Sequence, residues 1–212
     1  MKVGIFGGSF DPIHKGHINL AKYVLDHTDL DEVWLMVSPR NPLKPQGYVA
    51  TDGERLEMAR LAVDGIPGIR VSDFEFNLPI PSYTYKTLTE LKKAYPGHQF
   101  RLIIGGDNWA NFDRWRNPEE ILSEFGVIVY PRPDESLKDP LHSSLFTLHS
   151  SKIRILYDAP QMPVSSTKIR HLLQSHSPET ENQRIEKAPL DPNPPYLDKK
   201  VLAYIKKHSL YS

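Results

Sequence analysis

The 212-residue chain contains no cysteine and no long apolar run, and its formal charge is zero, with 26 basic and 26 acidic residues. Without cysteine it can form neither a disulfide nor a thiolate nucleophile, and a cysteine-ligated zinc site is excluded. Balanced charge argues against a protein that coats nucleic acid, and no segment approaches the ~18 apolar residues of a membrane span. The N-terminus has no signal-peptide pattern, so we expect a cytoplasmic protein that binds neither nucleic acid nor membrane.

Three familiar motifs are also missing. Residues 4–8 read Gly-Ile-Phe-Gly-Gly and do not fit the Gly-x-Gly-x-x-Gly fingerprint of dinucleotide-dependent dehydrogenases. The chain has no Gly-x-x-x-x-Gly-Lys-Ser/Thr phosphate loop and no Gly-x-Ser-x-Gly nucleophile elbow. Dehydrogenase, P-loop and serine-hydrolase chemistry are therefore disfavoured.

Short apolar runs alternate with segments of helical spacing. The expected strands are residues 2–6, 32–37, 69–72, 99–104, 126–130 and 152–157. The expected helices are residues 17–26, 53–64, 85–94, 118–124, 167–174 and 198–208. Apolar strands joined by helices indicate right-handed β-α-β units. We predict an α/β fold, a Rossmann-like open parallel sheet with helices on both faces, whose ligands bind at the carboxyl ends of the strands.

The chain is expected to form a single domain over residues 1–212. Residues 175–195 are polar and proline-rich, and too little chain follows them to build a second core. They are predicted to link the body of the domain to a C-terminal helix. Residues 39–51 hold three prolines, and this loop after the second expected strand is a candidate lid.

The most informative segment is residues 7–17, which read Gly-Gly-Ser-Phe-Asp-Pro-Ile-His-Lys-Gly-His. Two glycines follow a strand, and His14 and His17 stand three residues apart at the start of a helix, so both imidazoles share one face. Free backbone N–H groups at a helix start bind anions. A metal site with Asp11 as third ligand is the alternative, but phosphate binding is favoured, which points to nucleotide chemistry.

A second candidate anion site lies at residues 164–170, Val-Ser-Ser-Thr-Lys-Ile-Arg. Ser165 or Ser166 can cap the helix that Thr167 opens. The hydroxyls, Lys168 and Arg170 on one helical turn would also suit a phosphate. Taken alone, the segment is better explained as an ordinary capped helix.

Weaker signals follow the later strands. Gly105 and Asp107 belong to a Gly-Gly-Asp turn directly after the fourth expected strand. The backbone of this turn could approach a ribose, although a plain tight turn explains these residues equally well. Trp115 could stack on a flat cationic ring or belong to the core. Lys44 in the proline loop and Arg132 after the fifth strand are phosphate candidates, although each taken alone is better explained as a solvated charge.

These segments resemble the nucleotidyltransferase superfamily that carries the His-x-Gly-His signature. Within it, the chain is most similar to the bacterial nicotinate-nucleotide adenylyltransferases. The narrower resemblance rests on the segments Pro-Ser-Tyr-Thr at 81–84, Ile-Ile-Gly-Gly-Asp at 103–107, Phe-Asp-Arg-Trp at 112–115 and Val-Ile-Val-Tyr-Pro-Arg-Pro at 127–133. It runs to about residue 173 and departs at residues 175–195, which are longer and richer in proline than the family pattern.

The resemblance implies an enzyme of NAD biosynthesis that transfers AMP from ATP to nicotinate mononucleotide, with Mg2+ carried by ATP rather than by a protein cage. The implied catalytic residues are His14, His17 and Arg170. The implied ATP-binding residues are Gly7, Gly8, Ser9, Phe10, Lys44, Gly105, Asp107, Ser165, Ser166 and Thr167. The implied mononucleotide-binding residues are Thr84, Trp115, Arg116 and Arg132.

Several alternatives stay open. The acceptor could instead be nicotinamide mononucleotide, whose ring carries an amide in place of the carboxylate. A phosphopantetheine adenylyltransferase shares the signature, but the segments at 81–84 and 112–115 are not expected in one. A non-catalytic nucleotide-binding regulator would have no need for both histidines and Arg170. Either a monomer or a homo-oligomer agrees with the sequence.

Overall fold

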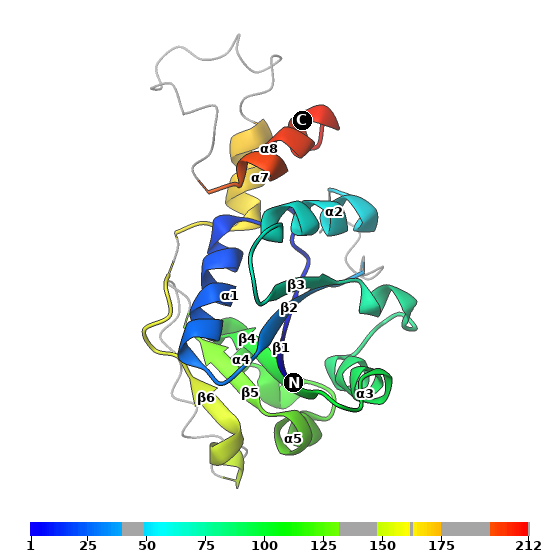
Figure 1. Cartoon of the computed structure of the whole chain (residues 1–212), viewed down its shortest axis with the longest axis vertical. Helices are drawn as coiled ribbons and strands as arrows, with labels where there is room; N and C mark the ends of the chain where they lie inside the picture. Colours follow the sequence, from blue (N-terminus) through cyan, green and yellow to red (C-terminus); the bar gives the residue numbers. More distant parts are fainter. Residues whose placement is uncertain (40–48, 132–147, 162, 175–195, 212) are drawn as a thin grey trace.

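The computed structural model describes residues 1–39, 49–131, 148–161, 163–174 and 196–211. Within them six parallel strands form one sheet in the order β3-β2-β1-β4-β5-β6 (Figure 1). The strands are β1 (Lys2–Gly8), β2 (Glu32–Val37), β3 (Ile69–Ser72), β4 (Gln99–Gly105), β5 (Val127–Tyr130) and β6 (Ile153–Ile155). Each lies where the apolar runs predicted a strand, and the parallel α/β sheet is confirmed.

Helices connect and cover these strands. The longer ones are α1 (Lys15–His27), α2 (Asp52–Val63), α3 (Thr84–Ala94), α7 (Ser166–Gln174) and α8 (Lys199–Lys207). The shorter elements are η1 (Phe74–Asn77), α4 (Gly106–Trp109), η2 (Phe112–Arg114), α5 (Pro118–Glu120), η3 (Ile121–Phe125) and η5 (Ser150–Lys152). None of the described helices is long and apolar enough to cross a membrane.

Each face of the sheet packs against its own set of helices. In β2, Val33, Leu35 and Val37 face a core formed with α1, α2, α7 and α8, whereas Trp34 and Met36 face a second core formed with α3 and η3. Side chains of a strand alternate between the faces, so a strand buried on both sides is apolar throughout. Figure 1 shows the first set of helices above and to the left of the sheet and the second set below it.

The segment predicted as a helix over 118–124 is more complex than expected. A single turn, α5, passes into the wider turn η3, in which Gly126 N donates to Ile121 O over 3.0 Å. Gly126 has a φ of 79°, and a Cβ there would lie 2.8 Å from Lys152 O. Glycine therefore allows the chain to turn tightly from η3 into β5 beside the segment that leads into β6.

The strand order reverses direction between β1 and β4, because β2 and β3 extend the sheet on one side of β1 and β5 and β6 extend it on the other. Connections leave the carboxyl ends of β1 and β4 toward opposite faces, which opens a crevice at that edge. The glycines at the end of β1 and Gly105 at the end of β4 flank this crevice. The fold thus places the predicted site segments at one edge of the sheet.

Candidate active site

The loop after β1 stacks two imidazoles at the start of α1. His14 caps the helix in an extended conformation, and its backbone N–H donates to His17 Nδ1 over 3.2 Å. The two rings are 3.7 Å apart, centroid to centroid, and 26° from parallel. The first turn of α1 carries no acidic side chain, so the partial positive charge of the helix start is left for an external anion.

Gly16 is required between the two histidines. A Cβ on Gly16 would lie 2.9 Å from both Cε1 and Nδ1 of His14, closer than side-chain carbons approach. The same Cβ would lie 3.5 Å from Val164, just before α7. The His-x-Gly-His spacing therefore has a steric basis, and the segment that leads into α7 lies beside it.

The N-terminal turn of α7 docks on the backbone next to the histidines. Ser166 Oγ donates to Pro12 O over 3.0 Å, and Arg170 Nη1 donates to Asp11 O over 2.7 Å. A second nitrogen of Arg170 donates to Thr167 Oγ1 over 3.2 Å. Residues more than 150 positions apart in the sequence are thus brought to one place, so the two candidate anion sites lie side by side.

Ser165 is the N-terminal cap of α7, because its Oγ accepts from Lys168 N over 3.2 Å and its carbonyl accepts from Ile169 N over 3.0 Å. The first turn of α7 also lacks acidic side chains. Two helix starts, neither with an acidic side chain in its own first turn, therefore converge near Asp11 and Pro12. Such a pair suits a ligand with several negative charges.

Asp11 is a buried hub that the sequence indicated only as a weak metal ligand. Its carboxylate accepts from Val49 N over 2.9 Å, from Ala50 N over 3.2 Å and from the phenol of Tyr211 over 2.7 Å. Burial, followed by the hydrogen bond to Asp11, raises the pKa of Tyr211, so the phenol keeps its proton and remains the donor. The second-last residue of the chain is therefore tied to the loop beside the histidines.

Arg55 is a further functional candidate that the sequence analysis missed. Its side chain is fully buried on α2, where it donates to Ser9 O, to Ser38 O over 2.8 Å and to Asp52 Oδ1 over 2.7 Å. It thus joins the loop after β1 to the end of β2. The one available signal was a charged residue next to apolar ones in a segment predicted as a helix, and a buried charge is usually paired.

A pocket of about 200 Å3 opens beside the glycines of β1. Thr84, at the start of α3, and Trp115, after η2, both line it, together with Gly7, Gly8 and Glu75. The ring of Trp115 is held by Phe112, 5.3 Å away between centroids. The structure thus brings together two of the residues predicted for the mononucleotide, and it adds a buried carboxyl that sequence reasoning did not single out.

Other predicted residues are placed less directly. Phe10 is buried against Phe6 and His17, so only its backbone could meet a ligand. Arg116 lies over the ring of Tyr83, 4.8 Å from its centroid. Asp107 lies in α4, directly after Gly105 and Gly106. The predictions for Lys44, Arg132 and the linker 175–195 concern residues outside the described ranges.

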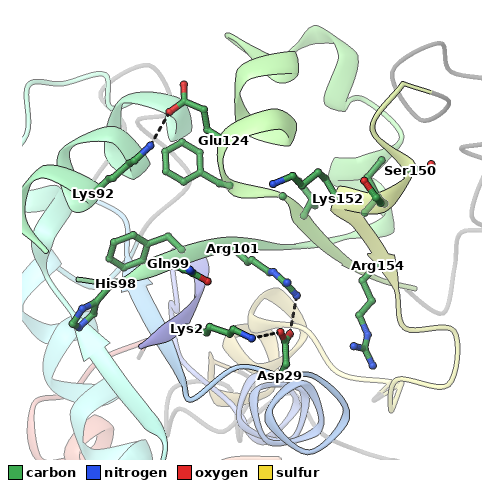
Figure 2. A pocket seen from close by; sticks show the side chains of 16 residues that line it. Lys2, Asp29, Lys92, His98, Gln99, Arg101, Glu124, Ser150, Lys152 and Arg154 are labelled. Carbon is green, nitrogen blue, oxygen red and sulfur yellow. Dashed lines mark hydrogen bonds and ion pairs between the residues drawn. The ribbon is translucent and has the colours of Figure 1, made fainter. Parts of the chain in front are cut away.

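A larger hollow of about 750 Å3 lies at the opposite edge, around the amino ends of β1, β4 and β5 (Figure 2). Figure 2 shows that charged side chains surround it, and several neutralise one another. Lys2 and Arg101 each lie 2.8 Å from a carboxylate oxygen of Asp29, and Lys92 lies 3.3 Å from Glu124. None of the predicted site residues lines this hollow.

Within the described ranges no three His, Asp or Glu side chains are arranged to hold a metal ion. The described donors near the histidines are instead N–H and hydroxyl groups, which bind anions. A parallel α/β sheet with a glycine turn, an imidazole pair and a second helix start at its switch point defines a protein of the nucleotidyltransferase class.

Known proteins support this class. A family model described as cytidylyltransferase-like matches residues 5–172. A relative from Bacteroides fragilis, named a probable nicotinate-nucleotide adenylyltransferase, is 49% identical over 173 residues, covering 81% of this chain and 82% of the relative. One of the same name from Flavobacterium johnsoniae is 39% identical over 212 residues, covering 100% of this chain and 99% of the relative.

Solved structures agree on the fold. The Plasmodium falciparum nicotinic acid mononucleotide adenylyltransferase complexed with NaAD superposes with a TM-score of 0.72 at 19% identity, covering 99% of this chain and 97% of that one. The chain therefore belongs to the cytidylyltransferase-like family and, within it, to the nicotinate-nucleotide adenylyltransferases. The resemblance stated from the sequence is confirmed.

Proposed function

We propose that the chain transfers the AMP part of ATP to nicotinate mononucleotide, giving nicotinate adenine dinucleotide and pyrophosphate in NAD biosynthesis. The observation that carries this is the meeting of the His14–His17 pair with Ser166 and Arg170 at Asp11 and Pro12. The full-length similarity to a relative named for this activity supports the choice of acceptor.

The triphosphate of ATP would lie across the two helix starts. His14 and His17 face it from α1, and Ser165, Ser166, Thr167 and Arg170 face it from α7. Gly7, Gly8 and Ser9 let its phosphates approach the backbone of β1. Lys44 would be an additional phosphate contact. ATP would enter as its Mg2+ complex, because the ion can be held by phosphate oxygens and water without a protein cage.

In the reaction a phosphate oxygen of the mononucleotide bonds to the α-phosphorus of ATP, and the bond from that phosphorus to the bridging oxygen breaks. The nucleophile is largely a dianion at neutral pH, since the second pKa of a phosphate monoester is about 6. Pyrophosphate leaves as a stable anion. The protein therefore needs no general base; it aligns two anions and stabilises the charge that spreads during transfer.

The 200 Å3 pocket would hold the pyridine ring. Trp115 would stack on the ring, and Thr84 with the backbone near Trp115 would meet its carboxylate. Arg116 and Arg132 would contact the rest of the mononucleotide. Gly105 and Asp107 would contact the adenosine ribose from the end of β4.

Incubation of the protein with ATP, Mg2+ and one acceptor at a time, followed by product mass and pyrophosphate release, tests the function. We expect nicotinate adenine dinucleotide, with a smaller specificity constant for nicotinamide mononucleotide and no product from phosphopantetheine. Tight ATP binding without turnover would instead support a regulator.

The role of the imidazoles is tested by His17→Ala. We expect kcat to fall by about 100-fold or more, because charge stabilisation in transfer is lost, while the KM for ATP changes much less. The control is His208→Ala, which removes an exposed imidazole at the end of α8. Turnover of His17→Ala close to the wild-type value would contradict the assigned role.

A further inference from the structure

A buried carboxyl stands in the wall of the proposed pyridine pocket. Glu75 lies in η1 and is 9% exposed. Its Oε1 accepts from Thr87 Oγ1 over 2.8 Å, and the Ser38 hydroxyl also hydrogen-bonds to it. Both hydroxyls and the carboxyl line the pocket that Thr84 and Trp115 line.

No cation compensates this carboxyl among the described residues. The described lining of the pocket contains no Lys, Arg or His, and the two groups that hydrogen-bond to Glu75 are neutral. Burial raises the pKa of Glu75. A buried charge without a partner is unfavourable, so an ionised Glu75 would be stabilised by a positively charged ligand in the pocket.

The pyridine ring of a mononucleotide is such a ligand. Its nitrogen carries the ribose as a fourth bond, so the ring is a permanent cation at every pH. The face of Trp115 attracts a flat cation as well. Building on the proposed function, we propose that Glu75 is a binding residue that supplies the counter-charge for the pyridinium ring of the mononucleotide.

The size of the pocket sets the expected effect. A sphere of 200 Å3 is about 7 Å across, so a ring inside it lies within about that distance of the carboxylate. Two unit charges about 7 Å apart, at effective dielectric constants of about 20 to 40, attract by an amount equal to a roughly 10- to 50-fold change in affinity.

The test compares a charged with an uncharged ring on the same nucleotide. Dissociation constants are measured for oxidised and reduced nicotinamide mononucleotide with a non-hydrolysable ATP analogue present, since the reduced ring has no charge. We expect the wild type to favour the oxidised form. Glu75→Gln should reduce that preference about 10- to 50-fold, mainly by weakening the oxidised form, while Glu75→Asp should keep most of it.

An unchanged preference in Glu75→Gln, or equal weakening of both forms, would overturn the proposal, because a purely structural carboxyl acts on both rings alike. A Glu75→Asp preference as low as that of Glu75→Gln would do so too. If Glu75→Gln does not fold, equal binding of the two forms by the wild type would refute it. Failure of the wild type to form any dinucleotide would reject the proposed function instead.

Discussion

The hydrogen bond between Tyr211 and Asp11 provides a sharp test of how the loop after β1, which we propose binds phosphate, is held. The substitution Tyr211→Phe removes one oxygen and leaves the ring. Tyr211 is 2% exposed and Asp11 is 1% exposed, and the phenol lies 2.7 Å from Asp11 Oδ1. Water cannot replace the lost donor without opening the core. Among the described residues, the carboxylate would then keep its two backbone N–H donors and the more distant Arg170.

A hydrogen bond to a charged group contributes about 1.5–3 kcal/mol, so the free energy of unfolding should fall by about that amount. The effect on function follows from the other contacts of Asp11. Its backbone oxygen accepts from Arg170, so movement of Asp11 shifts the guanidinium that we propose faces the triphosphate. We expect the KM for ATP to rise several-fold while the KM for the mononucleotide stays within about twofold.

Urea unfolding and steady-state kinetics measure these quantities. Tyr204→Phe is the control, because Tyr204 lies on α8 and its phenol makes no hydrogen bond to any other described residue; its ring packs against that of His208. A double-mutant cycle with Asp11→Asn should show coupling of at least about 1 kcal/mol. Additive effects of the two substitutions would show that the hydrogen bond does not stabilise the loop.

Three further predictions follow from single contacts. Gly16→Ala should lower kcat about tenfold or more, because the added Cβ displaces the His14 ring. The free energy of unfolding should not fall, since alanine favours helix over glycine by about 1 kcal/mol. The control Gly53→Ala, with open space around its Cβ, should leave kcat unchanged. Arg55→Met should lower the free energy of unfolding by about 1.5–3 kcal/mol, measured by urea, because the carbonyls of Ser9 and Ser38 lose a charged donor; a loss below about 1 kcal/mol would contradict this. The raised pKa of Glu75 means that the folded protein keeps this proton to higher pH than the unfolded chain. The stabilisation that the protonated carboxyl gives the folded state is therefore full below about pH 4.5 and is lost as pH rises through the folded pKa. The stability of the wild type relative to Glu75→Gln should fall from pH ~4 to pH ~8, and a constant difference would refute the assignment.

The sheet was predictable because its signal is local. Strands such as β2 are short and apolar on both faces, and the helices between them carry helical spacing and recognisable starts, so every strand and longer helix falls within a few residues of its expected place. The turn η3 was not predicted, since the i to i+5 hydrogen bond that forms it depends on Gly126 packing beside Lys152. That contact joins two segments far apart in the sequence and has no local pattern.

The site shows the same division. His14, His17 and Ser165 sit at helix starts, where local spacing predicts caps or anion contacts. Arg55 and Tyr211 could not be found in this way, because their partners lie 46 and 200 positions away. A lone arginine on an apolar helix face, or a tyrosine near the end of the chain, gives no indication of which loop it will hold.

The buried polar contacts explain how a loop can be rigid and still bind phosphate. Apolar side chains cannot hold the loop after β1 from its ligand side without filling the space that the phosphates need. Arg55 instead binds the carbonyl of Ser9 from α2, and Tyr211 binds the carboxylate of Asp11 from the C-terminal segment. Glu75 acts at a separate place, between β2 and α3. Substitutions at Arg55 and Tyr211 should therefore alter the kinetics of ATP, and those at Glu75 the kinetics of the mononucleotide, so a variant at Tyr211 that weakened only the mononucleotide would contradict this arrangement.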